Sequence, residues 1–242
     1  MLEALGWGAL AAASLLIGAL VGLARRWPDR ALGLVLAFGA GALISAISFD
    51  LALEGLRIGS ARAVALGLAG GALTFFALDA VVMKRFGRSL KHRDPSQVGN
   101  AGPSLALGAL LDGIPEQFVL GTGLAASGGV RIGLLVAIFV SNLPEAIASA
   151  TEMHEQGFDR GRITRLWVVL TIVCTLSTVV GFAVADAGRG ELTAAADGFA
   201  AGTLLVMLID AMVPEAIRKA GRIAGLMTTL GFAVAAGLAT VS

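Results

Sequence analysis

Charged residues are scarce in this chain. Only 14% of its 242 residues are Asp, Glu, Lys or Arg, and 57% are hydrophobic. Soluble domains average about 25% charged residues. Residues 4–24, 166–185 and 223–242 contain no charged residue at all, and each stretch is about as long as a helix that crosses a hydrocarbon core of about 30 Å. The composition therefore indicates a polytopic membrane protein with essentially no soluble part.

Cysteine and histidine are equally rare. The single cysteine, Cys174, excludes a disulfide framework and a CxxC metal site. The sequence contains neither an HExxH motif nor a GxxxxGK[ST] nucleotide motif, and neither His92 nor His154 lies inside an expected span. We therefore expect no enzyme, no prosthetic group and no nucleic-acid partner.

The apolar runs predict an all-α fold of eight transmembrane helices in one domain covering residues 1–242. The expected helices are about 3–24, 31–56, 62–86, 100–126, 130–155, 165–186, 192–217 and 222–241. Only the stretch of about 87–99 is long and polar enough to be a true loop.

The basic residues are distributed unevenly between the two ends of these helices. If the first loop is cytoplasmic, 14 of the 18 Lys and Arg residues lie on that side, and only Arg57, Arg62, Arg131 and Arg189 lie on the other. This asymmetry follows the positive-inside rule. It predicts that both termini lie outside the cytoplasm and that the loop at about 87–99 lies inside.

Residues 38–57 and 199–218 resemble each other. The two stretches align without gaps and share Phe, Ala, Gly, Leu, Glu and Arg at six of twenty positions. In the expected topology the two copies run in opposite directions. Inverted repeats of this kind are typical of transporters whose binding site lies near the membrane midplane.

Polar residues interrupt two neighbouring apolar segments. Asp112 and Glu116 lie four residues apart in "LDGIPEQFVLG", and Ser141 and Glu145 repeat that spacing in "VSNLPEAIAS", with Asn142 between them. Residues four apart share one helix face. A carboxylate at bilayer depth is costly, so it is expected to face a partner, a cavity or an ion.

Each of these motifs also contains a proline. Pro115 and Pro144 remove a backbone N–H and clash with the carbonyls of Leu111 and Val140. The carbonyls freed in this way can face a cation where they line a cavity. Together with the carboxylates, amide and hydroxyl, they predict a cation site between the fourth and fifth helices.

The motifs "DGIPE" and "SNLPE" resemble the paired metal motifs of the ZIP (Zrt/Irt-like protein) metal transporters, His-Asn-x-Pro-Glu-Gly and His/Gln-Glu/Asp-x-Pro-Glu-Gly. The stretch "FAAGTLLVMLIDAMVPEA" also resembles the seventh helix of that family, and "WGALAAASLLIGALVGL" its prokaryotic branch. The resemblance implies a 3+2+3 inverted-repeat bundle in a bacterial cytoplasmic (inner) membrane. The expected partners are the lipid bilayer, divalent metal ions and a second copy of the chain in a homodimer.

The resemblance implies a set of metal ligands. Glu116 and Glu145 match the two motif glutamates, Asp112 and Ser141 stand where the family has its histidines, and Asn142 follows Ser141. Asp210, in the seventh helix, occupies a further position that can hold a ligand. These ligands would bind a transported divalent cation.

Several positions depart from the family pattern. Both motif histidines are replaced, Gln117 and Ala146 replace the closing glycines, and Thr178 stands where the sixth helix often has a glutamate. The remaining donors are almost all oxygen, which favours harder ions such as Mn²⁺ over Zn²⁺, whereas the family default is zinc. A transporter of another small cation and a non-transporting sensor or scaffold remain alternatives.

Four further residues are candidates for ion access. Asp50 and Glu54 lie four apart near the outer end of the second helix, where an ion could enter or where solvent could simply cover the helix end. Glu215 lies near the cytoplasm beside Arg218, as an exit ligand or as an ion pair. His154, at the inner end of the fifth helix, could contact an exiting ion.

Overall fold

The structure is a computed structural model that describes residues 1–85, 101–127, 129–187 and 190–239. Within these ranges, side chains are not described at residues 82–85, 101–109, 111, 112, 126, 127, 186, 187 and 239. The expected loop at about 87–99, His92 and the side chain of Asp112 therefore lie outside the described residues.

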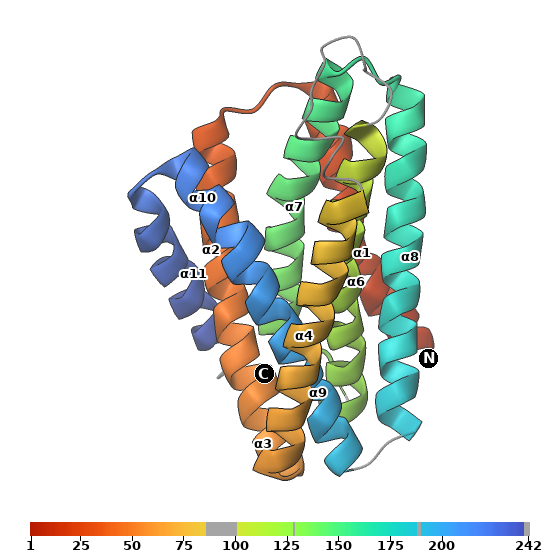
Figure 1. Cartoon of the computed structure of the whole chain (residues 1–242), viewed down its shortest axis with the longest axis vertical. Helices are drawn as coiled ribbons and strands as arrows, with labels where there is room; N and C mark the ends of the chain where they lie inside the picture. Colours follow the sequence, from red (N-terminus) through yellow and green to blue (C-terminus); the bar gives the residue numbers. More distant parts are fainter. Residues whose placement is uncertain (86–100, 128, 188–189, 240–242) are drawn as a thin grey trace.

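The described chain is all-helical and closely follows the expected segments. The helices are Leu2–Ala24 (α1), Asp29–Ala46 (α2), Ile47–Leu53 (η1), Glu54–Ile58 (α3), Ala61–Arg85 (α4), Ala101–Ser127 (α6), Ile132–Glu155 (α7), Arg160–Ala187 (α8), Glu191–Met207 (α9), Leu208–Met212 (η2), Val213–Ala220 (α10) and Ile223–Ala239 (α11). Segments α2–η1–α3 and α9–η2–α10 each form one continuous rod, so the described residues make eight rods (Figure 1).

Six rods are long and apolar enough to cross a membrane: α1, α2–α3, α4, α7, α8 and α9–α10. The apolar helix Ile223–Leu238 is shorter, and α6 is only partly described. The described residues thus establish a multi-pass helical protein, while the count of eight spans stays a prediction.

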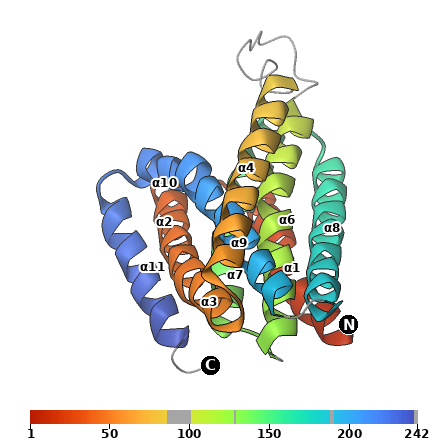
Figure 2. The same cartoon turned by 60° about the horizontal axis from the view of Figure 1, so that its bottom comes forward.

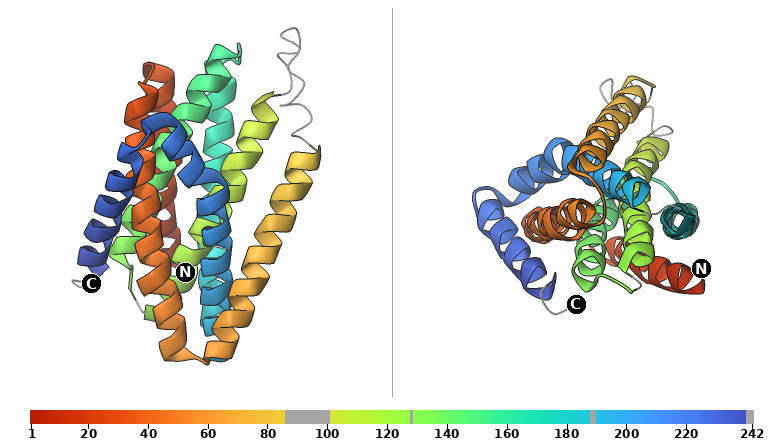
Figure 3. Two further views of the ribbon diagram at one scale, coloured as in Figure 1. Left: turned by 60° about the vertical axis from the view of Figure 1, so that its left-hand side comes forward. Right: turned by 90° about the horizontal axis from the view of Figure 1, so that it is seen from below.

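The helices pack in two groups (Figures 2 and 3). Helix α1 packs on α7 and α8, and α6 packs on α8. In the second group α4 packs on α9, while α2 packs on α10 and α11. The groups meet mainly where α2 lies against α7 and α6 lies against α9. We call the end of the bundle that carries Leu2, Ile58 and Ser127 the terminal face, and the end that carries Ala24, Glu155 and Ala220 the opposite face.

Two long helices contain a π-helical stretch, η1 and η2. In the predicted repeat, Ile47 aligns with Leu208, so both stretches begin at the same repeat position. The ion pairs Glu54–Arg57 and Glu215–Arg218 also fall at aligned positions. Such wide turns are rare and occur frequently at functional sites. Both observations agree with the repeat, whose functional meaning stays a prediction.

Glycines allow α4 and α9 to approach closely. A Cβ on Gly67 or Gly71 would collide with the backbone carbonyls of Ala195 or Phe199, and a Cβ on Gly202 would collide with that of Leu68. Small residues that permit such backbone contact are the usual means of packing helices in a membrane.

We expect Gly71→Ala to destabilise the protein by about 1–3 kcal/mol, because the added methyl must push the two backbones apart. Gly70→Ala is the matched control. Its Cβ would meet only the Cδ2 atom of Phe199, at 3.8 Å, and alanine favours the helix. Thermal unfolding of both variants in detergent measures the difference, and equal unfolding temperatures would contradict the close packing.

Candidate metal site on two proline-containing helices

The two proline motifs lie on α6 and α7, with Pro115 and Pro144 inside their helices. Glu116 is 1% exposed, and the Ser141 hydroxyl donates a hydrogen bond of 3.2 Å to its Oε1 atom. The same hydroxyl lies 3.0 Å from the Ile138 carbonyl oxygen. The structure therefore brings the two motifs together through one acid and one hydroxyl, while the cation site expected between them stays a prediction.

Helix α2 holds this contact in place. A Cβ on Gly39 would lie 2.8 Å from the Cα atom of Ser141, so the α2 backbone presses directly on the α7 motif. The neighbouring Asn142 is also buried, and its Nδ2 atom has no hydrogen-bond partner among the described residues. A buried N–H donor without a partner is costly, so this amide nitrogen is available to a hydrogen-bond acceptor at the site.

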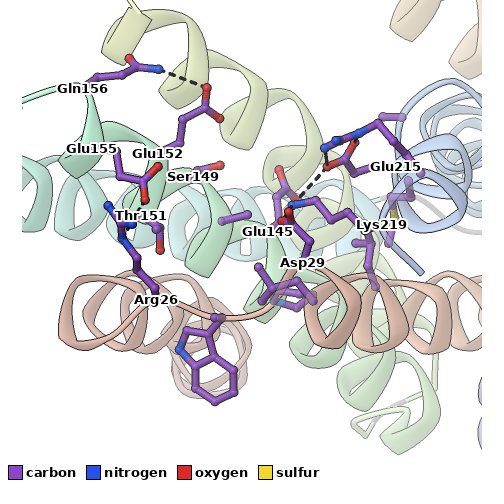
Figure 4. Close-up of a pocket in the computed structure, with 18 residues that line it drawn as sticks. Arg26, Asp29, Glu145, Ser149, Thr151, Glu152, Glu155, Gln156, Glu215 and Lys219 are labelled. Atoms are coloured by element: carbon purple, nitrogen blue, oxygen red, sulfur yellow. Dashed lines mark hydrogen bonds and ion pairs between the residues drawn. The ribbon is translucent and has the colours of Figure 1, made fainter. Parts of the chain in front are cut away.

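Glu145 lies next to this buried core, at the end of a cleft. The cleft has a volume of about 710 Å³ and is lined by Leu32 and Leu36 of α2, by Pro144, Glu145, Ala148, Ser149 and Glu152 of α7, and by Glu215 and Lys219 of α10, among others. Figure 4 shows Glu145 on the same side of α7 as Glu152 and Glu155, which lie nearer the opposite face. Glu145 is half-buried, whereas Glu116 does not line the cleft.

The other end of the site is closed by apolar packing. Val119 and Leu120 follow Glu116 on α6, while Leu134 and Ile138 precede Ser141 on α7, and all four are buried. The candidate site is therefore accessible from the opposite face through the cleft and closed toward the terminal face.

Cys174 of α8 borders the site, which the sequence did not suggest. A Cβ on Gly113 would lie 2.8 Å from its Sγ atom, and the charges of both Glu116 and Glu145 act on the thiol. One turn further along the same interface, the Thr178 hydroxyl donates a 2.6 Å hydrogen bond to Gln117 Oε1. Two of the departures from the family pattern, Gln117 and Thr178, therefore contact each other directly.

The remaining candidates lie elsewhere. Asp210 is exposed on η2, and its charge acts on Asp79 of α4. His154 is exposed, with Nδ1 3.4 Å from the Phe158 carbonyl oxygen. Asp50 is half-buried in η1, and Glu54 pairs with Arg57 at 3.5 Å. A metal role for these residues stays a prediction.

Glu215 forms the ion pair that the sequence offered as one alternative. Its Oε1 atom lies 2.6 Å from Arg218 Nη2 and 3.4 Å from Lys219 Nζ. Lys219 also lies 3.4 Å from Asp29 across the mouth of the cleft (Figure 4). Among the side chains that the structure describes, no three His, Cys, Asp or Glu residues lie together as a metal cluster. The side chain of Asp112 is not among those described.

The fold and site define a multi-pass helical membrane protein with a buried acid on one proline-containing helix and a cleft-lining acid on the next. No protein-family model matches the chain. It is 32% identical over 196 residues to an Arabidopsis thaliana protein named "Putative zinc transporter", in an alignment that covers 78% of this chain. The chain spans about 30% of the length of that relative.

Proposed function

We propose that this chain is a ZIP-like transporter that moves divalent metal cations across the bacterial cytoplasmic membrane. The observation that carries the proposal is the contact of Ser141 with Glu116 beside Glu145, where the cleft ends. This contact joins both proline motifs at one place, and the cleft provides a route to that place. The relative named as a zinc transporter supports the same class of cargo.

The proposed ligands are the carboxylates of Glu116 and Glu145, with Asp112, Ser141 and Asn142 completing the site. An ion held there would be coordinated by the Asn142 amide oxygen and would neutralise the buried charge of Glu116. The cleft would be the cytoplasmic route, consistent with the basic residues Arg26, Arg218 and Lys219 that line it. Both termini then lie outside the cytoplasm.

Uptake into vesicles containing the purified protein tests the proposal. We expect the protein to take up metal ions along their gradient, without added nucleotide. Vesicles made without protein give the background rate. Uptake of every divalent ion at that background rate would favour the non-transporting alternative.

Ion selectivity follows from the donor atoms. Because the proposed ligands are oxygens, we expect Mn²⁺ or Fe²⁺ to compete for uptake at least as well as Zn²⁺. Competition across a panel of metals against one labelled ion measures the order. A strict preference for Zn²⁺ or Cd²⁺ would contradict the oxygen-only ligand set and would implicate the nearby Cys174 thiol.

A further inference from the structure

A buried carboxylate and a half-buried guanidinium interact electrostatically toward the terminal face. Asp197 of α9 is fully buried, and neither of its carboxylate oxygens has a hydrogen-bond partner among the described residues. Arg131 stands immediately before α7, and its Nη2 atom is likewise buried without a partner in the described structure. The two charges act on each other. Leaving the carboxylate and one guanidinium nitrogen without hydrogen bonds is costly, which points to a group that the pair exchanges.

Arg131 is held by a backbone oxygen instead. Its Nη1 atom donates a hydrogen bond to the carbonyl oxygen of Asp50, which lies in the wide turn of η1. The guanidinium is therefore a permanent positive charge bound to a carbonyl oxygen close to a carboxylate. Oxygen donors of these two kinds are ligands that hard divalent cations use.

The surroundings of Asp197 are negative and rich in oxygen. A Cβ on Gly55 would lie 3.6 Å from the Cβ atom of Asp197, so α3 lies against this carboxylate. The charge of Glu54 also acts on Asp197. The Thr122 hydroxyl of α6 lies beside it but donates to the Val119 carbonyl oxygen at 3.0 Å. The hydroxyl oxygen is a further oxygen donor that a cation held beside Asp197 could use.

We propose that Arg131 is a tethered cation that occupies a cation-binding position formed by Asp197 and the Asp50 carbonyl oxygen, and that a divalent cation entering from the terminal face takes its place. This inference rests on the proposed function, because the position would be the first one that the transported ion meets. A doubly charged ion interacts with a carboxylate twice as strongly as a singly charged one. It can therefore displace the guanidinium where Na⁺ or K⁺ would not.

The exchange would also loosen one contact between the two helix groups. Arg131 joins α6 to α7 in the first group, whereas Asp50 and Asp197 lie on rods of the second. While Arg131 is bound, it ties the groups together at the terminal face, where the site is closed. Arrival of an ion would release that tie.

Equilibrium binding of Mn²⁺ tests the position directly. The full chain carrying Glu116→Gln and Glu145→Gln is purified in detergent, so that the proposed main site does not contribute to binding. Adding Arg131→Gln should tighten Mn²⁺ binding by about tenfold or more, because the resident competitor is removed. Adding Asp197→Asn to that variant should abolish the gain. Arg62→Gln, which removes an exposed arginine at the same face, is the matched control and should leave the affinity unchanged.

Two results would overturn the proposal. One is an Arg131→Gln protein that binds Mn²⁺ no more tightly than its parent, and the other is a gain that survives Asp197→Asn. If Arg131→Gln does not fold, Asp197→Asn alone serves as the test, because it should still remove the residual Mn²⁺ binding of the parent protein. Because no transport is measured and Glu116 and Glu145 are already neutral, failure here is distinct from failure of the proposed function.

Discussion

Vesicles containing the Glu116→Gln or the Glu145→Gln protein should take up metal at least about tenfold more slowly than the wild type. Each substitution keeps the size of the side chain and removes one negative charge at the proposed site. Glu116 is the more demanding case, because it is 1% exposed and already accepts a hydrogen bond from Ser141. A neutral amide at that position cannot offset the charge of a bound cation.

The matched control is Glu3→Gln, an exposed acid in the first turn of α1. It should leave uptake unchanged. Ser141→Ala should reduce uptake less than either glutamate variant, because it removes one hydrogen bond and no charge. The amount of folded protein in the vesicles is measured in every case. Wild-type uptake by either glutamate variant would remove that residue from the metal site.

The second large effect is expected from filling the cleft. Ala148 lines it on α7, close to Glu145. A tryptophan there would occupy the route while leaving every charged group in the sequence, and uptake should fall to that of vesicles made without protein. Ala233→Trp, at an exposed position of α11, adds the same side chain away from the cleft and should transport normally.

An ion-binding measurement separates a blocked route from a damaged site. In detergent, the Ala148→Trp protein should still bind the transported metal once equilibrium is reached, although the rate of binding should be lower. If uptake continues at the normal rate, the cleft is not the path of the ion. Loss of equilibrium binding together with uptake would instead mean that the substitution distorts the site itself.

The helical segments were predictable because their signals are local. An expected helix at about 62–86 corresponds to Ala61–Arg85, and one at about 130–155 to Ile132–Glu155. The apolar runs fix these lengths, and charged or proline-rich connections mark the ends. Pro115 and Pro144 also lie inside their helices, as their apolar flanks suggest. The π-helical stretches had no such signal, since nothing in "ISFDLAL" or "LIDAM" distinguishes a π-helical turn from an α-helical one, although each contains an aspartate.

The site was predictable only in part. The motif spacing identified Glu116, Ser141 and Glu145, because an acid inside an apolar helix requires a specific environment. Contacts between distant helices left no such pattern. The sequence did not single out Asp197, and it placed Arg131 only on the side away from the cytoplasm. In the structure Asp197 is buried, Arg131 is half-buried, and their charges act on each other.

The two π-helical stretches mark where each long helix exchanges its neighbours. Before η1, the rod lies against α7, α10 and α11, and after it α3 lies against α9. Before η2, α9 lies against α4 and α6, and after it α10 lies against α2. A straight α-helix advances about 100° per residue, so one surplus residue turns all later side chains to a new direction. Each rod therefore has two contact surfaces that point in different directions, one before the wide turn and one after it. Deleting a single residue within either wide turn would rotate the second surface away from its partners and leave the first surface unchanged.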